Sequence, residues 1–347
     1  MRFIFAIQRL IYPIINLNFI GFFKYYKPES KVVVISSLLT TKKFLSESIC
    51  WEIGFINALI ERKINFSIKS LSGNFQNKII FWSPNQNFDK YKVRNYTDSI
   101  TFLAKQLEKQ GNKIFVKANE IKYLENKYYM HKMFDELEIN TPTTWYYKST
   151  NDIDYNLLTF PLLFKGVHSS GSQDIFKFNN LNDLKIFISN YEKHNPNLEI
   201  VLQKLVNMRK DMRVTTIGNE IIFSFWRINK SKEWKTTATK NGASVIFEDV
   251  PDQWKNYILE CVKKTKMDIC GLDITFENDN TKNKPYILEV SPRFSQNPPY
   301  KNKKFTYGDY KKKVFIKNNY RYNQTKVLID LAKKYIFHLL DKKNILS

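Results

Sequence analysis

The sequence predicts a mixed α/β (α+β) protein in which a small domain with a parallel sheet precedes a larger domain. Between residues 31 and 118, short apolar runs alternate with segments of helical periodicity, a pattern typical of a parallel α/β unit. Further along, residues 211–227 and 269–290 indicate β-hairpins, each with a polar turn between two strand-like runs. A chain of 347 residues with 43% hydrophobic residues can bury the cores of more than one domain.

Three buried strands and two helices account for the first domain. The apolar runs at 32–36, 78–82 and 113–116 predict the strands, and the periodic segments at 46–62 and 97–110 predict the helices. This region lacks the glycine fingerprint of a dinucleotide-binding fold. We therefore interpret it as a substrate or scaffold domain.

The larger domain is expected to begin with a helix at 124–137, which the segment before Pro142 ends. Its further elements are strands at 160–165, 176–178 and 199–203, a helix at 181–194, and the hairpin that turns at Gly218-Asn219. The last hairpin, 269–290, completes the predicted domain.

Each strand of the last hairpin carries one carboxylate within an apolar run, Asp273 on the first strand and Glu289 on the second. A carboxylate that is removed from water is costly unless it is paired or bound to a cation. Two of them on adjacent strands can meet on one face of the sheet, and such oxygen ligands suit Mg²⁺. The alternative is a solvated sheet face from which both carboxylates point to water.

A loop of glycine and serine follows directly after the predicted strand that ends in Lys165, with the sequence GVHSSGS at 166–172. The N–H groups and hydroxyls of such a loop can surround phosphates, and a lysine adds a point charge. The loop lacks the Gly-Lys-Ser/Thr ending of a P-loop, so a plain turn is the alternative. Arg213 and Arg227, on opposite strands of the 211–227 hairpin, could converge on a phosphate or carboxylate.

The composition is strongly basic, with 55 Lys and Arg against 33 Asp and Glu and a net charge of +22. This excess favours a polyanionic partner or surface, although part of it reflects a Lys-rich composition throughout the chain. Three cysteines without metal or redox spacing fit a reducing compartment. The four histidines are scattered, which argues against a His-based zinc site.

The N-terminal residues 3–23 are strongly apolar, but Gln8, Arg9 and Pro13 interrupt them. They lack the unbroken apolar region and small-residue cleavage site of a secretory signal. An in-plane membrane helix followed by lysines is one interpretation, and a helix packed on the protein's own surface is the other. We expect a cytoplasmic protein that can be peripheral to the inner face of a membrane.

The C-terminal residues 301–347 carry 13 Lys and Arg against three Asp, and 325–340 has the periodicity of an amphipathic helix. The stretch 303–313 interleaves aromatic residues with lysines and could bind a phosphorylated substrate, nucleic acid or anionic lipid. A solvated basic tail is the alternative. The predicted division of the chain is an apolar segment at 1–30, an α/β domain at 31–118, a larger domain at 119–300 and a basic extension at 301–347.

Seven motifs follow one another in residues 120–300. In chain order they are Lys127, Lys165 with its Ser-Ser-Gly-Ser loop, Val201-Leu-Gln203, Asp211-x-Arg213, the 233–242 loop, Gly271-Leu-Asp273 and Glu289-Val-Ser-Pro-Arg293. This ordered set resembles the ATP-grasp ligases, most closely the ribosomal-protein glutamate ligase and glutathione synthetase type. The resemblance implies an ATP-grasp fold preceded by a small α/β domain, with ATP and Mg²⁺ as cofactors and Mn²⁺ as an alternative metal.

The resemblance also implies a role for each matching residue. Nucleotide contacts fall on Lys127, Lys165, Ser169, Ser170, Gly171, Ser172, Gln203, Lys204, Leu205, Asp211, Lys235, Thr236 and Thr237. Within that set, the lysines reach the nucleotide and its phosphates, the serine loop closes over them, 203–205 reads the adenine edge, and Asp211 faces the ribose. The metal ligands are Asp273, Glu289 and Ser291, and the catalytic residues are Arg227 and Lys235 at the phosphates and Arg293 at the acyl substrate.

Three positions depart from the family pattern. Ser291 stands where the third metal ligand is usually Asn, so a second Mg²⁺ is expected to bind more weakly, and Asn297 could stand in. Lys204 replaces the acidic residue that is common beside the adenine, which puts that contact in doubt. Asn126 replaces the usual Asp before Lys127.

We therefore predict an ATP-dependent, ADP-forming ligase that joins a carboxylate to an amine through an acylphosphate. The expected acid is an anionic small molecule, glycan or peptide that is used in cell-surface glycan or peptide-conjugate assembly. A homodimer is a further hypothesis. A kinase on the same scaffold is one alternative, which its products would distinguish. A non-catalytic nucleic-acid or membrane binder is the other; such a binder gains nothing from Asp273 and Glu289, so we do not expect a nucleic-acid partner.

Overall fold

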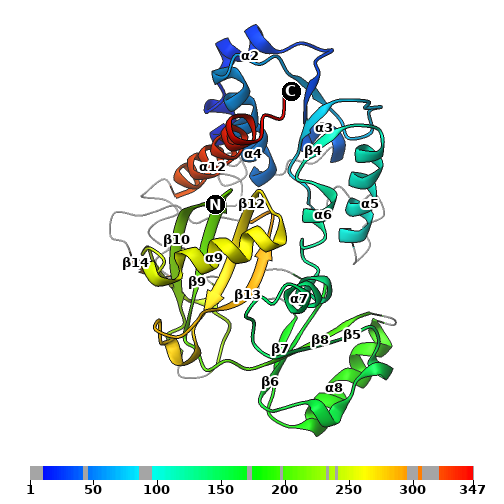
Figure 1. Ribbon diagram of the computed structural model, residues 1–347, viewed down its shortest axis with the longest axis vertical. Coiled ribbons are helices and arrows are strands. Elements are labelled where there is room, and N and C mark those ends of the chain that lie inside the picture. The colour runs from blue at the N-terminus through cyan, green and yellow to red at the C-terminus, as the bar shows by residue number, and fades with distance from the viewer. Residues whose placement is uncertain are drawn as a thin grey trace. The chain divides into compact units, whose positions relative to one another are not determined.

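The computed structural model describes residues 11–41, 46–85, 96–169, 174–195, 198–231, 234–238, 241–294, 304–306 and 320–346. The chain divides into two compact units (Figure 1). The first comprises Met1–Ile121, Pro292–Lys301 and Gly308–Ser347, and the second comprises Lys122–Ser291 and Asn302–Tyr307. One sheet is parallel and two are antiparallel, which confirms the predicted mixed α/β class.

A four-stranded parallel sheet forms the centre of the first unit, in the order β2-β1-β3-β4. Its strands are β1 (Val32–Ile35), β2 (Ser67–Lys69), β3 (Ile79–Phe81) and β4 (Lys113–Phe115). Every residue of β1 and β3 is buried, as is usual for a parallel sheet that is covered on both faces. The sequence predicted this sheet from three of its strands; β2 is the additional one.

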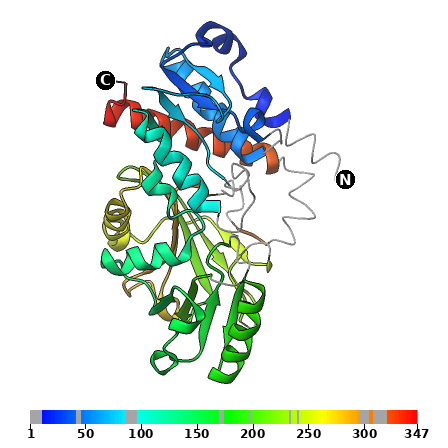
Figure 2. The ribbon, with the colours of Figure 1, turned by 90° about the vertical axis from the view of Figure 1, so that its right-hand side faces the viewer.

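Helices surround this sheet and include a pair formed by distant parts of the chain. They are α2 (Phe19–Tyr25), α3 (Ser37–Thr41), α4 (Ser46–Glu61), α5 (Tyr96–Lys109), α6 (Ala118–Ile121) and α12 (Tyr320–Lys343). Figures 1 and 2 show α12 lying along α4. Gly54 of α4 permits this approach, because a Cβ built there would lie 2.6 Å from the Ile329 carbonyl oxygen. The predicted amphipathic helix at 325–340 is therefore packed into the unit through buried residues such as Ala332 and Ile336.

The smaller sheet of the second unit has four antiparallel strands in the order β5-β8-β6-β7. They are β5 (Thr144–Tyr147), β6 (Leu162–Lys165), β7 (Ile175–Phe178) and β8 (Ile200–Lys204). Helix α8 (Leu181–His194) covers one face, as Figure 2 shows, and buries Leu184 and Ile188 against the sheet. This arrangement places Lys165 at the end of β6.

The larger sheet of the second unit has six strands in the order β13-β12-β9-β10-β11-β14, and all of its pairings are antiparallel. They are β9 (Lys210–Ile217), β10 (Glu220–Ile228), β11 (Ser244–Ile246), β12 (Ile269–Thr275), β13 (Tyr286–Ser291) and β14 (Lys304–Thr306). Two helices, α7 (Lys127–Glu136) and α9 (Asp252–Thr265), belong to the same unit.

The two faces of this six-stranded sheet differ in chemistry. One face forms an apolar core with α7 and α9, built from residues that include Met130, Phe134, Met212, Val214, Ile258, Val262, Leu272, Ile274 and Val290. Because successive strand residues point to opposite faces, the polar residues between them project from the other face. That polar face carries the paired carboxylates predicted from the sequence.

Several element boundaries differ from the sequence prediction. The helix expected at 124–137 begins at Lys127, because the Asn126 side chain accepts a hydrogen bond from the Tyr129 N–H and caps the helix there. Helix α9 and the short strands β2, β11 and β14 were not predicted. Short strands carry little periodicity, whereas α9 has an apolar stripe at Ile258 and Val262 that could have been recognised.

The terminal segments are described only in part. The apolar N-terminal segment is described from residue 11 onward and includes α2. No helix among the described residues is long and apolar enough to cross a membrane. Of the basic aromatic stretch 303–313, only 304–306 lies within the described residues, as strand β14.

Candidate functional site

On the polar face of the six-stranded sheet, charged residues of four strands lie in register. Asp273 of β12 lies directly opposite Glu289 of β13 and, on its other side, opposite Arg213 of β9. Asp211, two residues before Arg213 and therefore on the same face, lies opposite Arg227 of β10. Residues directly opposite each other in an antiparallel pair project from one face, so these five side chains share one surface.

Ion pairs join the arginines of this cluster to its aspartates. Arg213 holds Asp273 with both Nε and Nη2, the latter at 3.2 Å from Oδ2. Arg227 lies between the two aspartates: its Nη2 is 2.8 Å from Asp273 Oδ2, and its Nε donates to Asp211 Oδ1 at 2.9 Å. Arg213 and Arg227 thus converge on one anion, and that anion is a carboxylate of the protein itself, Asp273.

Burial and charge act in opposite directions on the two aspartates. Burial raises the pKa of Asp273, but the guanidinium groups of Arg213 and Arg227 outweigh it and hold the pKa at about 2. Burial raises the pKa of Asp211 above its ordinary value, against the opposing effects of Arg227 and of a hydrogen bond from Thr237. Asp273 is consequently an anion at neutral pH, and Asp211 is an ion-pair partner of Arg227 as well as the predicted ribose residue.

Glu289 has a different environment from Asp273. A β-bulge at Leu288 follows the Asp273–Glu289 pair, and bulges commonly reorient side chains beside functional sites. Within the described ranges, Glu289 has no hydrogen-bond or ion-pair partner. Its side chain is half-buried, so this carboxylate is available to a cation.

Two lysines from different elements are buried beside these carboxylates. Lys127 begins α7 and Lys165 ends β6, and they are only 6% and 8% exposed. Lys127 Nζ donates to the Ser169 carbonyl and, at 3.3 Å, to its hydroxyl. Burial and the neighbouring Lys127 lower the pKa of Lys165 to about 8, against the opposing charges of Glu289 and Asp273.

The Lys165 ammonium has no hydrogen-bond or ion-pair partner in the part of the chain that the structure describes. A buried charge is costly unless it is paired, so this ammonium group lacks the anion that its burial calls for. The chemistry of the pair Lys127 and Lys165 therefore fits a polyphosphate.

The predicted phosphate loops are described in part. Ser169 is buried and contacts Lys127, whereas Ser170, Gly171 and Ser172 lie outside the described residues. In the other loop, Thr237 is buried and its hydroxyl bonds Asp211, as noted above. Lys235 is exposed, and the Thr236 hydroxyl accepts a hydrogen bond from Asn241 at 2.6 Å.

The predicted adenine segment, 203–205, connects the two sheets of the second unit. Gln203 is buried, and its side-chain amide donates to the Thr144 hydroxyl at 2.9 Å. The Lys204 N–H donates to the Thr143 carbonyl at 2.8 Å, and the Leu205 N–H donates to the Pro161 carbonyl at 3.1 Å. Because both backbone donors are used, an adenine ring would have to be recognised through other groups of this segment.

The last residue of β13 and the residues after it belong to different compact units. Ser291 ends β13 in the second unit, whereas Arg293 lies in the first and Asn297 lies outside the described residues. Arg293 donates to the hydroxyls of Ser83 at 3.2 Å and Ser48 at 3.3 Å. Neither serine was predicted from the sequence as a site residue.

A buried polar cluster surrounds Arg293 in the first unit. Asn85 donates to the Ser48 hydroxyl at 3.2 Å, and Glu52, one helical turn after Ser48, accepts from the Ser37 N–H at 2.8 Å. Burial raises the pKa of Glu52 to about 7. These residues follow the carboxyl ends of β1 and β3, where the strand order reverses and open α/β sheets usually bind ligands. Their position after predicted strands was the signal that could have identified them.

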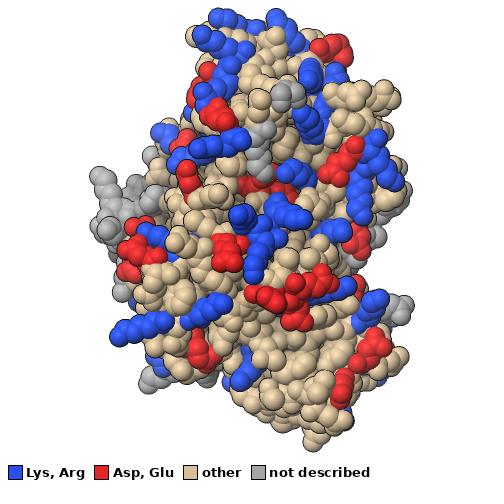
Figure 3. Space-filling view, in the orientation of Figure 1, with Lys and Arg blue, Asp and Glu red and all other residues tan. Residues whose placement is uncertain are grey.

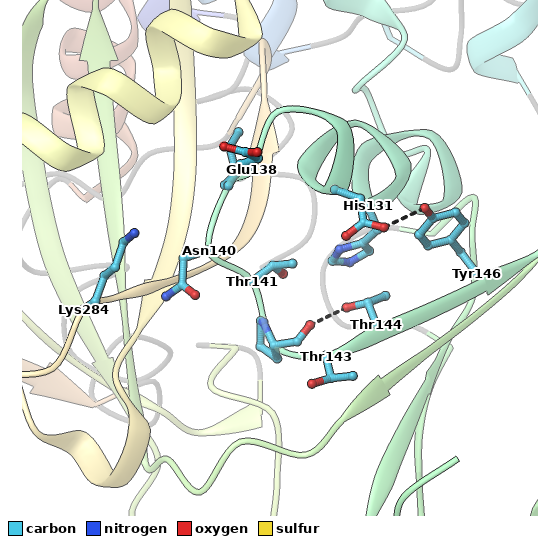
Figure 4. Close-up of a pocket in the computed structure, with 11 residues that line it drawn as sticks. His131, Glu138, Asn140, Thr141, Thr143, Thr144, Tyr146 and Lys284 are labelled. Atoms are coloured by element: carbon cyan, nitrogen blue, oxygen red, sulfur yellow. Dashed lines mark hydrogen bonds between the residues drawn. The ribbon is translucent and has the colours of Figure 1, made fainter. Parts of the chain in front are cut away.

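A separate cavity of about 380 Å³ lies between α7 and the connection to β5, as Figure 4 shows. It is lined by none of the residues predicted for the site. Neither ring nitrogen of His131 nor the Thr141 hydroxyl has a partner in the described parts of the chain. At its rim, Asp135 accepts a hydrogen bond from the Tyr146 hydroxyl at 2.9 Å. The cavity is polar but distinct from the carboxylate cluster.

Positive charge is spread over the surface. On the face shown in Figure 3, Lys and Arg side chains are interspersed with Asp and Glu and do not form one continuous stripe. A continuous basic stripe is the usual feature of nucleic-acid recognition. On this face the basic side chains are therefore distributed among acidic ones.

Comparison with known proteins gives a family and a fold. A family model described as the RimK-like ATP-grasp domain matches residues 124–299. None of the curated proteins matches the chain by sequence.

Among solved structures, D-alanine–D-alanine ligase from Bacillus anthracis has a TM-score of 0.55 at 13% identity, covering 89% of this chain and 98% of that one. The same ligase in complex with ATP has a TM-score of 0.53 at 13% identity, covering 88% and 97%. The RimK domain ATP-grasp protein from Sphaerobacter thermophilus DSM 20745 has a TM-score of 0.53 at 10% identity, covering 88% and 99%. At these identities the similarity concerns the fold.

Proposed function

The chain belongs to the RimK-like ATP-grasp family and is an ATP-dependent ligase; we propose that it joins a carboxylate to an amine through an acylphosphate. The observation that carries this proposal is the pair of buried lysines, Lys127 and Lys165, beside a carboxylate that has no partner among the described residues, Glu289. The two ammonium groups can bind phosphate oxygens and the carboxylate can bind a metal ion, so this set suits a metal–polyphosphate ligand. The ATP-grasp resemblance drawn from seven sequence motifs is confirmed by the family match.

The carboxylates fit a divalent cation. Asp273 is anionic at neutral pH and lies opposite Glu289, so the two can supply oxygen ligands from adjacent strands, with Ser291 as a third. Mg²⁺ held there would neutralise charge on the phosphoryl oxygens during transfer, and Mn²⁺ has similar ligand preferences. Arg227, which already pairs with Asp273, would then lie beside the transferred group.

The proposed reaction has two steps. A carboxylate oxygen of the acid attacks the γ-phosphorus of ATP, the bond from that phosphorus to the bridging oxygen breaks, and ADP leaves. The amine nitrogen then attacks the acyl carbon, phosphate leaves with one oxygen of the original carboxylate, and the nitrogen loses a proton to give the amide. Neither step needs a side-chain nucleophile, and Lys127, Lys165 and Arg227 serve by stabilising phosphoryl charge.

The remaining nucleotide contacts are proposed from the sequence motifs. Lys235 and Thr236 would approach the phosphates, and the 169–172 loop would cover them and keep water from the acylphosphate. The 203–205 segment would border the adenine, which cannot use the two N–H groups that donate to Thr143 and Pro161. Asp211 would reach the ribose only by sharing its carboxylate with Arg227.

We assign the acid to the polar cluster of the first unit. Arg293 supplies a guanidinium that suits a carboxylate, and Ser48, Ser83 and Asn85 add hydrogen-bonding groups around it. Glu52 could accept a bond from a hydroxyl or ammonium group of the same molecule. The basic composition favours an anionic acid, for example one used in glycan or peptide-conjugate assembly at the cell surface.

A thermal-shift titration with ATP tests the nucleotide and metal sites without knowledge of the acid. A ligand at a hundredfold excess over its Kd stabilises the folded state by about 2.7 kcal/mol. We expect a rise in Tm with ATP that depends on Mg²⁺ and that shrinks in Glu289→Gln. The exposed Glu220→Gln on β10 is the matched control and should behave like the wild type. The absence of any rise with ATP and Mg²⁺ would contradict the proposal.

A further inference from the structure

Large apolar side chains are concentrated on the surface of residues 11–23. Six of them are exposed by 40% or more: Ile11 44%, Ile14 40%, Ile15 56%, Phe19 48%, Ile20 87% and Phe23 77%. In all the rest of the described chain, only seven other large apolar residues are comparably exposed, and these are scattered from Leu38 to Leu346. In both helical stretches, 11–15 and 19–25, these residues recur three or four positions apart and so share a helix face, and exposed apolar faces mark interaction sites.

The segment that carries these side chains is fixed to the first unit by its other face. Asn18 caps α2, and its N–H donates to the Asn57 side chain of α4 at 3.0 Å. Phe22 packs edge-on against Phe66 with ring centroids 5.7 Å apart. Gly21 is buried against Ile60, where a Cβ would overlap the Ile60 side chain. Phe19, Ile20 and Phe23 therefore lie on a helix that the fold holds in place.

The charge of the segment is one-sided. Lys24, Lys27 and Lys31 follow the apolar residues and are all exposed. Between residues 11 and 31 the only acidic residue is Glu29, and its carboxylate accepts a hydrogen bond from Lys69 at 3.0 Å. An apolar surface bordered by lysines complements an anionic bilayer, in which apolar side chains enter the acyl region and ammonium groups stay near the phosphates.

We propose that residues 11–31 form a peripheral docking surface for an anionic phospholipid bilayer. Ile15, Ile20 and Phe23 enter the interface, and Lys24 and Lys27 contact lipid phosphates. Tyr25 at the end of α2 and Tyr26 directly after it have the amphipathic rings that favour the headgroup region. This surface does not depend on the ligase reaction, because none of its residues belongs to the proposed nucleotide or acid site.

Vesicle sedimentation with the full chain tests the proposal. Wild-type protein is expected to pellet with vesicles of phosphatidylcholine and phosphatidylglycerol, and to pellet less with phosphatidylcholine alone. The variant Ile20→Asp/Phe23→Asp should bind at least about tenfold more weakly, because two charges would enter the apolar region. The matched control Phe102→Asp/Ile186→Asp changes two side chains that are each 64% exposed elsewhere on the surface, and it should bind like the wild type.

Each other outcome overturns the proposal. Equal binding of the wild type and the Ile20/Phe23 variant would show that lipid is bound elsewhere. If the wild type binds neither type of vesicle, a bilayer is excluded as the partner of this surface. Equal binding to both vesicle types would contradict the role of the lysines. If light scattering instead shows a dimer that the Ile20/Phe23 variant loses, without vesicle binding, the surface is an interface between two copies of this chain. Circular dichroism verifies that both variants are folded.

Discussion

Asp273 and Glu289 face each other across β12 and β13, but only Asp273 is held by arginines. Replacing Asp273 with Asn leaves the Arg213 guanidinium without its carboxylate and Arg227 with Asp211 alone, which should lower the free energy of unfolding by about 3 kcal/mol. Glu289→Gln removes no described ion pair and should change it by less than about 1 kcal/mol. Both variants should lose Mg²⁺-dependent ATP turnover, by about a hundredfold or more. Urea unfolding and ADP release measure the two quantities.

This contrast separates a structural carboxylate from a metal ligand. If Glu289→Gln were as destabilising as Asp273→Asn, the side chain would have a structural partner and would not be free for a cation. If Glu289→Gln kept full Mg²⁺-dependent turnover, the metal would be held elsewhere.

The charge of Lys165 predicts a pH dependence of nucleotide binding. Because its pKa in the folded protein is about 8, Lys165 is charged below that pH and loses its proton above it. ATP affinity should therefore fall as the pH rises through about 8, by up to about tenfold per pH unit. Lys165→Arg stays charged over this range, so its affinity should depend less on pH.

Calorimetric titration of ATP and Mg²⁺ from neutral to alkaline pH provides this measurement. ATP phosphates are fully ionised above neutral pH, so a decline in affinity reports the protein. An affinity of the wild type that stays constant through pH 8 and above would show that Lys165 does not contact the phosphates.

At the residue scale, sequence patterns gave candidate residues for the site but not the partners that the structure gives them. Asp273, Glu289 and Lys165 could be identified because each is a charge within or at the end of an apolar run, whereas Lys127 followed only from the family resemblance. The pairing of Arg227 with Asp211 depends on strand register, which neither residue's local sequence specifies.

At the scale of elements, the contact between α4 and α12 predicts that a Gly→Ala substitution destabilises the protein, opposite to its usual effect in a helix. Gly→Ala within a helix ordinarily stabilises it by about 0.5–1 kcal/mol. At Gly54 the new methyl group would meet Ala332 and the Ile329 carbonyl, so Gly54→Ala should instead destabilise the protein by about 1–3 kcal/mol. Ala58→Gly, at another buried position of α4, is the control. It should lower the free energy of unfolding, because Gly favours a helix less than Ala and the lost methyl group leaves a small cavity. A raised midpoint of urea unfolding for Gly54→Ala would contradict the α4–α12 packing.

Most long elements were predictable because burial imposes a period on the sequence. Helix α8 occupies the predicted range, 181–194, and β9 and β10 turn at the predicted Gly218-Asn219. The strands β2, β11 and β14 are three residues long and hold their place through pairing with distant segments. The equally short β3 and β4 were predictable because they lie in the apolar runs 78–82 and 113–116, whereas β2, β11 and β14 have too little apolar pattern to distinguish a strand from a loop.

At the scale of the whole molecule, nucleotide and acid are assigned to different compact units. Arg293→Ala should therefore raise the KM for the acid by about a hundredfold and leave the ATP affinity unchanged. Ser83→Ala, which removes one neighbour of Arg293, should have a smaller effect in the same direction. A loss of ATP affinity in Arg293→Ala would place this arginine at the phosphates instead.

The grouping of residues into units was the part of the architecture least accessible from sequence. Residues 292–301 lie between β13 and β14 in the chain and residues 308–347 follow β14, but both segments cluster with the first unit. The basic composition of the C-terminal residues favoured a solvated tail as one alternative, yet Leu331 and Leu339 of α12 are buried. Long-range packing of a helix depends on the surface it meets, which composition does not reveal.

The transfer of oxygen from acid to phosphate tests the proposed ligase chemistry most directly. The protein is incubated with ATP, Mg²⁺, an amine and a panel of acids labelled with ¹⁸O in the carboxylate, and the phosphate is analysed by mass spectrometry. An acylphosphate pathway predicts free phosphate that carries one ¹⁸O atom together with ADP, and none of this product with Glu289→Gln. Formation of ADP with a phosphorylated acceptor, or of phosphate without ¹⁸O, would contradict the proposed ligase reaction.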